Sequence, residues 1–209
     1  MTDHTGARLS GWMPGLHLSE EGQRQAKGLA ERLGPVPVDA LYASPLERCQ
    51  ETAAAVAEAK GLEVQTLEDV GEVRYGAWTG RTLKELGREP LWKVVQTTPS
   101  AARFPEGESL FEMQARAVLA VERLRGAHPR QTVAVCSHAD VIKALVCHYL
   151  GMHLDLFQRV VVSPASVTAI AFGPVPYLVR LNDIGGNGDL IPARRPRRRK
   201  RGEAASAEP

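Results

Sequence analysis

Helical and strand-like spacings of apolar residues alternate along the chain. The first helix begins after Ser19 and ends at Gly34-Pro35, and one of its faces carries Ala26, Leu29, Ala30 and Leu33. The pattern then predicts a strand at 38–43, a helix at 45–60, a short strand at 64–67, a helix from 109, a strand at 132–136, a helix at 137–150 and late strands at 166–172 and 177–181. This alternation predicts an α/β domain with a largely parallel sheet.

Several stretches add detail to this regular order. Residues 1–18 are predicted to form a loop, so the first helix has no strand before it, although an α/β domain commonly starts with one. Residues 70–108 are irregular apart from short helical pieces, and we expect an insertion over a site rather than a core layer. The strand at 132–136 is continuously apolar, which is typical of burial on both faces. Gly173-Pro174 favours a late hairpin at the sheet edge.

The charge of the chain is unevenly spread. Its 209 residues fit one domain with a tail, which we place at 1–191 and 192–209. Seven basic and two acidic residues give the tail a net charge of +5, and the remainder carries −3. Charge repulsion and the lack of apolar residues predict a disordered tail. Its run from Arg194 to Arg201 either contacts nucleic acid or another anionic surface, or only aids solubility.

The rest of the composition limits location and cofactors. No run of about 18 apolar residues predicts a membrane span, and the first residues lack the pattern of a secretion signal, so a cytoplasmic location is expected. The cysteines Cys49, Cys136 and Cys147 lack metal-binding spacing, and their odd number fits reduced thiols. We expect neither a metal ion nor another cofactor.

The segment from Ser44 to Arg48 opens a helix directly after an apolar strand. Ser44 is placed to cap this helix, Pro45 suits its first turn, and Glu47 completes a capping box. Free backbone N–H groups and the positive end of the helix dipole then face one spot, which the Arg48 guanidinium can also reach. This arrangement fits a phosphate-binding site, and it also fits a well-capped helix with a solvated arginine.

Two further segments carry side chains suited to catalysis. His138 follows a predicted parallel strand and opens the next helix, where α/β folds place ligands, although a partly buried structural histidine is the alternative. Glu72 lies among apolar and aromatic neighbours in a glycine-rich segment. Such surroundings raise the pKa of a carboxyl group and suit it to general-acid catalysis. A loop glutamate paired with Arg74 is the simpler interpretation.

Together these segments resemble the histidine phosphatase superfamily, the phosphoglycerate mutase-like proteins. Ser44 to Thr52 is similar to the family's Ser-x-x-x-Arg-x-x-x-Thr block, and Gly71 to Gly80 to its Gly-Glu-x-x-Tyr-Gly-x-Trp-x-Gly block. Residues 18–26 are similar to the start of its first helix, and Ser137-His138 to its second histidine. The resemblance covers nearly all of residues 2–182. It implies a three-layer α/β sandwich with a mostly parallel sheet.

The resemblance also implies roles for particular side chains. Arg48 matches the family's phosphate-clamping arginine, Glu72 its proton donor, and His138 the histidine that contacts the phosphoryl group. Further phosphate contacts are expected from Ser44, from Thr2 and from Ala139, which replaces a frequent glycine. Substrate contacts are expected from Ser10, Gly11 and Tyr75, and specificity from the irregular segment at 80–108, which includes Trp92, Arg103 and Phe104. Trp92 can equally be a core residue.

One family motif has no counterpart in the sequence. Arg-His-Gly-x-Thr ends the family's first strand, its histidine is the nucleophile, and Met1-Thr2 aligns with its last two positions. His4 and His17 lie in the loop without the required neighbours. We expect the first family strand to lie upstream of Met1, in roughly ten to fifteen additional residues, because losing an interior strand would leave strand edges unpaired. A chain that is truly shortened is the alternative.

The resemblance implies a phosphomonoester hydrolase that forms phosphohistidine without a metal ion. Its partner would be a small phosphorylated metabolite. The 209-residue chain, which lacks the nucleophile, is expected to be inactive. A phosphoglycerate-type phosphomutase is the first alternative, although the brief segment between Gly80 and Ser109 favours a phosphatase. A catalytically dead phosphate-binding or interaction module is the second.

Overall fold

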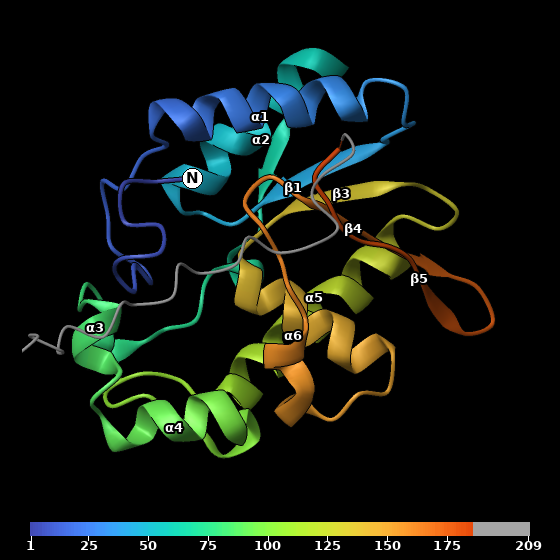
Figure 1. The fold of residues 1–209 in the computed structure, drawn as a ribbon. Coiled ribbons are helices and arrows are strands. Elements are labelled where there is room, and N and C mark those ends of the chain that lie inside the picture. Colours follow the sequence, from blue (N-terminus) through green and yellow to red (C-terminus); the bar gives the residue numbers. More distant parts are fainter. Residues whose placement is uncertain (186–209) are drawn as a thin grey trace, which may run out of the picture.

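The computed structural model describes residues 1–185 (Figure 1). The elements are α1 (Glu20–Leu33), β1 (Ala40–Ala43), α2 (Glu47–Lys60), β2 (Val64–Thr66), α3 (Leu83–Leu86), α4 (Pro90–Thr97), α5 (Leu110–Ala127), β3 (Val133–Cys136), α6 (Ala139–Tyr149), β4 (Val167–Phe172) and β5 (Pro176–Asp183). The predicted tail at 192–209, with its basic run from Arg194 to Arg201, lies outside the described residues.

The strands form two separate sheets. β1 pairs in parallel with both β2 and β3, giving the order β2-β1-β3, and β4 and β5 form an antiparallel hairpin. α1 and α2 cover one face of the parallel sheet, and α5 and α6 lie on the other side (Figure 1). The predicted α/β fold with a parallel sheet between helices is therefore confirmed, as is the late hairpin.

Local signals explain where several helices start and stop. The Ser19 side chain accepts a hydrogen bond from the Gly22 N–H and caps α1, as predicted. Ser109 and Glu112 form the predicted capping box at the start of α5. α2 ends at Gly61, whose left-handed conformation (φ 63°) suits glycine. These three boundaries place the helices that flank the parallel sheet.

The prediction that β3 is buried on both faces is wrong. All four of its residues are only half-buried. Among the described strands, β3 pairs with β1 alone, while β4 pairs with β5. Both β3 and β4 nevertheless border the same apolar cluster beneath α1 and α2. The half-exposure of β3 therefore comes from the lack of a strand on its second edge.

The segment at 70–108 does more than cover a site. Its predicted helical pieces are confirmed as α3 and α4. Several of its side chains are buried in the larger apolar cluster with α5 and α6, namely Val73, Tyr75, Trp78, Leu86, Val95 and Phe104. The expectation that it forms no core layer is therefore wrong, because its aromatic residues supply apolar area that the short sheet lacks.

Within residues 1–185, no helix is both long enough and apolar enough to cross a membrane.

Candidate active site

The ends of β1 and β3 bring the candidate side chains together. The N–H of Ser44, which follows β1, donates to the carbonyl oxygen of Cys136 at the end of β3 (2.9 Å). Ser44 and His138 therefore leave neighbouring parallel strands at the same sheet edge. Arg48 reaches this point from the first turn of α2, and Glu72 reaches it from the loop that precedes α3.

His138 is the centre of this group. Its side chain is 4% exposed, and its Nε2 lies 2.8 Å from the Ser44 hydroxyl oxygen. Its Nδ1 lies 3.2 Å from Nη2 of Arg48 and 3.7 Å from a carboxyl oxygen of Glu72. Because a guanidinium can only donate, Nδ1 accepts, and the ring hydrogen belongs on Nε2, facing Ser44. The contacts thus hold the imidazole in one orientation.

Arg48 is only partly satisfied by the protein. Its Nη2 donates to the Gly11 carbonyl oxygen (2.9 Å) as well as contacting His138. Its Nη1 is buried and has no hydrogen-bond partner among the described residues. A buried cationic donor without an acceptor is costly, and an anion beside His138 would satisfy this nitrogen.

The predicted capping box at Ser44 is wrong. The N-cap of α2 is Leu46, without a side-chain hydrogen bond, and the helix begins at Glu47. The Glu47 carboxylate instead accepts from the Gly15 N–H (2.8 Å). The Ser44 hydroxyl faces His138 and also accepts from the Leu46 N–H (3.3 Å). A tertiary contact to a distant histidine has therefore replaced the local cap, and Ser44 belongs to the site.

Glu72 is in surroundings that favour its protonated form. Its side chain is 15% exposed, and one carboxyl oxygen accepts from the Val73 N–H (3.0 Å). Burial raises the pKa of Glu72 to about 7, with a further contribution from the negative charge of Asp140, against the lowering effect of Arg48 and Arg116. Near neutral pH the carboxyl group can therefore both give and take a proton.

Replacing Glu72 with glutamine is expected to remove a pH-dependent loss of stability. The pKa of Glu72 is about 7 in the folded protein, against 4.5 for an ordinary glutamate, so the folded state binds the additional proton. Relative to Glu72→Gln, the wild type should lose about 3 kcal/mol of stability as the pH rises from 4.5 to about 7. Below pH 4.5 the free energies of unfolding of the wild type and of Glu72→Gln should differ by a constant amount. Denaturant unfolding between about pH 4 and pH 8 measures this difference.

The exposed residue Glu58 on α2 provides the matched control for that comparison. Glu58→Gln makes the same chemical change at an exposed carboxyl group, and it is the reference for the pH dependence of Glu72→Gln. If the change in the free energy of unfolding caused by Glu72→Gln varies no more with pH than the change caused by Glu58→Gln, the raised pKa of Glu72 is contradicted.

Tyr75 borders a small cavity beside these residues. Its hydroxyl donates to a carboxylate oxygen of Asp140 (2.9 Å), and burial holds the pKa of Tyr75 well above its usual value, so it remains a donor. The cavity holds about 90 Å³, and its lining includes Leu9, Tyr75, Trp78, Trp92, Phe104 and Asp140. Trp92 both lines this space and packs against the core, so the two interpretations of Trp92 are compatible. Arg103 instead pairs with Glu112.

Of the other predicted contact residues, Gly11 and Ala139 lie next to Arg48 and His138, whereas Thr2 and Ser10 bond elsewhere. Gly11 is buried against Arg48 through its carbonyl oxygen, and its backbone has φ 51°. Ala139 is the first residue of α6, directly after His138. Thr2 is buried, but its recorded hydrogen bonds go to Thr5, and the Ser10 carbonyl accepts from Met13. Among the described contacts, none joins Thr2 or Ser10 to Arg48.

Three residues around the site have contacts that the sequence-based prediction does not include. Asp140 faces Tyr75 and Glu72, the Trp12 indole N–H donates to the Glu72 carbonyl oxygen (2.5 Å), and Arg116 binds the same carbonyl (2.9 Å). Arg116 had a usable signal, because it stands three positions after Met113 and four before Ala120, both on the buried face of α5. Within residues 1–185, no three His, Cys, Asp or Glu side chains are grouped to hold a metal ion.

Comparison with known families agrees with this arrangement. The model of the histidine phosphatase superfamily (branch 1) matches residues 1–184. The chain belongs to this superfamily. The resemblance in Ser44 to Thr52 and around Glu72 and His138 is thereby confirmed at the level of the family, while the role of each residue stays a prediction.

Relatives within the histidine phosphatase superfamily include both phosphatases and mutases. Phosphoserine phosphatase 1 of Hydrogenobacter thermophilus is 36% identical over 156 residues, which are 73% of this chain and 74% of that protein. A probable phosphoglycerate mutase of Photorhabdus laumondii is 27% identical over 164 residues, 77% of this chain and 76% of that protein. A mycobacterial glucosyl-3-phosphoglycerate phosphatase, solved with VO3, has a TM-score of 0.80 at 26% identity, covering 88% of this chain and 94% of that one.

Proposed function

We propose that this superfamily member is a phosphomonoester hydrolase that acts through a phosphohistidine intermediate. The observation that carries the proposal is the unpartnered Nη1 of Arg48, a buried cationic donor beside His138 and Glu72. A phosphoryl oxygen is the acceptor that best suits such a donor. Glu72 supplies a carboxyl group whose pKa, about 7, suits proton transfer at neutral pH.

We assign the nucleophile to a histidine two residues before Met1, so the 209-residue chain is itself inactive. Both ring nitrogens of His138 are engaged by neighbouring side chains, so His138 lacks the free nitrogen that a nucleophile needs. His17 is exposed and pairs with Glu51, and His4 lies in the first loop. Neither follows a strand among the described elements.

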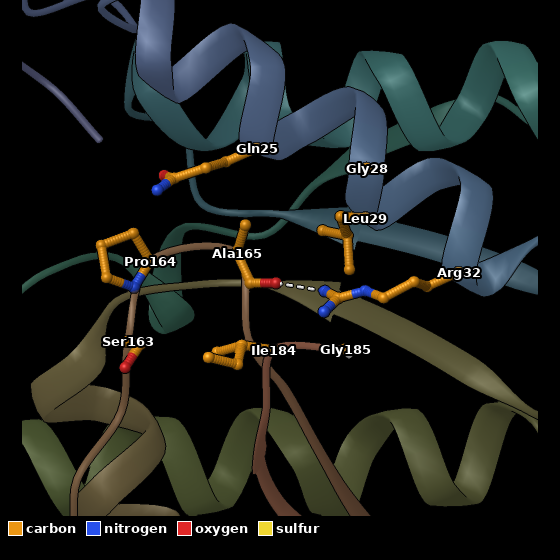
Figure 2. A pocket seen from close by; sticks show the side chains of 9 residues that line it. All are labelled: Gln25, Gly28, Leu29, Arg32, Ser163, Pro164, Ala165, Ile184 and Gly185. Atoms are coloured by element: carbon orange, nitrogen blue, oxygen red, sulfur yellow. Dashed lines mark hydrogen bonds between the residues drawn. The ribbon is translucent and has the colours of Figure 1, made fainter. Parts of the chain in front are cut away.

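A groove beside the two sheets supports an upstream strand. Figure 2 shows it between α1 on one side and the segments at 163–165 and 184–185 on the other, with Arg32 reaching across to the Ala165 carbonyl oxygen (2.5 Å). The groove holds about 410 Å³. Because β3 and β4 flank the same cluster without pairing to each other, an extended segment there would pair with both free edges.

The chain reaches this groove at Met1. The Met1 amino group donates to the Gln25 side chain (3.1 Å), at one end of the groove, and Arg32 lines the other end. The helix between them spans about 10 Å, or about three residues of extended chain. Two buried polar atoms in this region, Nε of Arg32 and Oγ of Ser166, have no partner among the described residues. The backbone of an added strand would supply such partners.

The proposed reaction has two steps. The upstream histidine attacks phosphorus while Glu72 protonates the leaving oxygen, and Glu72 then takes a proton from the water that attacks phosphohistidine. Arg48, the arginine that precedes the upstream histidine, and His138, with a hydrogen on Nδ1 when the anion is bound, hold the phosphoryl oxygens and offset the charge of the transition state. We assign Ser44, Thr2 and the backbone N–H of Ala139 to the same anion, since the start of α6 favours negative charge. No step requires a metal ion.

The substrate we propose is a small phosphorylated metabolite. The cavity lined by Tyr75 and Asp140 is only about 90 Å³, and four of its nine lining residues are aromatic, which suits a compact leaving group. We place Ser10, Gly11 and Tyr75 around that leaving group. A relative named phosphoserine phosphatase supports a small phosphomonoester, and a relative named as a probable phosphoglycerate mutase keeps a phosphomutase as the second candidate.

Product analysis separates these two candidates. A form that includes the upstream strand is expected to release inorganic phosphate from phosphoserine and 3-phosphoglycerate, with at least about tenfold less conversion of 3-phosphoglycerate to its isomer. Phosphorus NMR follows both products in one sample. Isomer formation that outpaces phosphate release would establish the phosphomutase. If neither product forms while phosphate still binds, the protein is a catalytically dead binding module.

A further inference from the structure

One mostly buried arginine outside the predicted phosphate-binding site binds the loop that carries Glu72. Arg116 lies on α5, and its side chain is only 18% exposed. Its Nη1 donates to the carbonyl oxygens of Asp69 (2.8 Å) and Gly71 (2.9 Å), and its Nη2 donates to the carbonyl oxygen of Glu72 (2.9 Å). A single guanidinium thus holds three carbonyl groups over four consecutive residues, ending at the residue proposed as the proton donor.

Glu108 fixes that guanidinium from the other side. Its two carboxylate oxygens accept from Nη2 (2.6 Å) and Nε (3.0 Å) of Arg116, and its side chain is 11% exposed. One of these oxygens also accepts from the Arg74 N–H (2.8 Å), while the Glu108 N–H donates to the Arg74 carbonyl oxygen (2.9 Å). The loop is therefore held both at Glu72 itself and two residues after it.

The Glu72 side chain has little else to direct it. One carboxyl oxygen is bonded to the adjacent Val73 N–H, and the other lies 3.7 Å from His138. The direction of the carboxyl group therefore follows from where the backbone of Glu72 is placed. The charged and titratable groups that face it are Arg48, Arg116, His138 and Asp140.

We propose that Arg116, held by Glu108, is a positioning residue that sets Glu72 against His138 for proton transfer. The proposal rests on the role of Glu72 in the proposed function. A bidentate, mostly buried pair fixes geometry far better than an exposed ion pair, and lysine cannot span the same set of acceptors. A small displacement of a proton donor is enough to slow the proton transfer that depends on it.

The same helix supplies a matched control. Arg123 also lies on α5 and also pairs with this loop, through the Asp69 side chain, but it is 58% exposed and has no recorded bond to a loop carbonyl. Arg123→Lys therefore makes the same chemical change at an ion pair that does not hold the backbone. It separates positioning from a general effect of changing arginine on α5.

The test is the titration of the Glu72 carboxyl group in the 209-residue chain, followed by carbon NMR with labelled glutamate and assigned with Glu72→Gln. The wild-type midpoint should lie near 7. In Arg116→Lys the positive charge remains but the loop loosens, so the carboxyl group gains water and its midpoint should fall by at least about one pH unit. Arg123→Lys should leave the midpoint unchanged.

Two results would overturn the proposal. An unchanged midpoint in folded Arg116→Lys would mean that Arg116 does not hold the position of Glu72. A rise in the midpoint of Arg116→Gln with no fall in Arg116→Lys would mean that Arg116 acts by charge alone. If one of these two Arg116 variants fails to fold, the other decides. In the folded variant the amide exchange of residues 71–74 should also quicken at least about tenfold. Because this readout needs no turnover, it can succeed where the proposed hydrolase activity fails, and the reverse.

Discussion

A form of the protein that begins roughly ten to fifteen residues before Met1 is expected to hydrolyse phosphomonoesters, whereas the 209-residue chain is not. The extension would fill the groove along α1 from Gln25 to Arg32 and place a histidine two residues before Met1. Arg48, Glu72 and His138 are already assembled, and the extension adds the first strand with the nucleophile and the arginine that precedes it. The expected difference in turnover is at least about 10⁴-fold, which is typical of losing a catalytic nucleophile.

Phosphate release from p-nitrophenyl phosphate, measured side by side, gives this ratio. The control is the extended form with alanine in place of the added histidine. It restores the strand but not the nucleophile, and it should be as inactive as the shorter chain while being more stable to denaturant. Equal turnover by the 209-residue chain and the extended form would contradict the assignment of the nucleophile upstream of Met1.

Arg48→Lys is expected to lower kcat/KM of the extended form by about 10²- to 10³-fold. Arg48 uses one guanidinium nitrogen to bind Gly11 and contact His138, and keeps a second nitrogen free for the phosphoryl group. A lysine has a single ammonium group and cannot serve both sides, so the transition state loses a donor. The ratio corresponds to about 3 to 4 kcal/mol of transition-state stabilisation.

Arg24→Lys is the control for that substitution. Arg24 is exposed on α1 and pairs with Glu21 one turn earlier, so its replacement should change kcat/KM by less than about twofold. Isothermal titration of the 209-residue chain with orthovanadate should show weaker binding in Arg48→Lys. Arg24→Lys should bind orthovanadate as the wild type does. Full activity and vanadate binding in Arg48→Lys would show that the free nitrogen of Arg48 does not face the phosphoryl group.

Local signals predicted the helices better than they predicted the contacts of the site. The caps at Ser19 and Ser109 depend on residues within one turn, and both are confirmed. Ser44 carries the same type of signal, yet its hydroxyl faces His138, which lies 94 positions along the chain. A capping pattern contains no information about a distant partner that competes for the same hydroxyl group.

The remaining differences have the same origin in tertiary structure. The apolar sequence of β3 predicts burial, but burial also requires a neighbour on each edge, and in the described chain β3 has one on a single edge. Arg116 binds backbone carbonyl groups about 45 residues away, and a backbone acceptor leaves no mark in the sequence. By contrast, Arg48, Glu72 and His138 could be recognised, because the family resemblance fixes them by motif and order.

Trapping the covalent intermediate tests the proposed chemistry most directly. The extended form, mixed with a phosphate-labelled substrate and quenched in base, should carry an acid-labile, base-stable label on the peptide that contains the added histidine. The 209-residue chain should carry none. Glu72→Gln should slow both formation and breakdown of the label when the leaving group is an alkoxide, because Glu72 serves both steps. Turnover by the extended form with no labelled histidine, or with the label on Ser44 or Cys49 instead, would contradict a phosphohistidine mechanism.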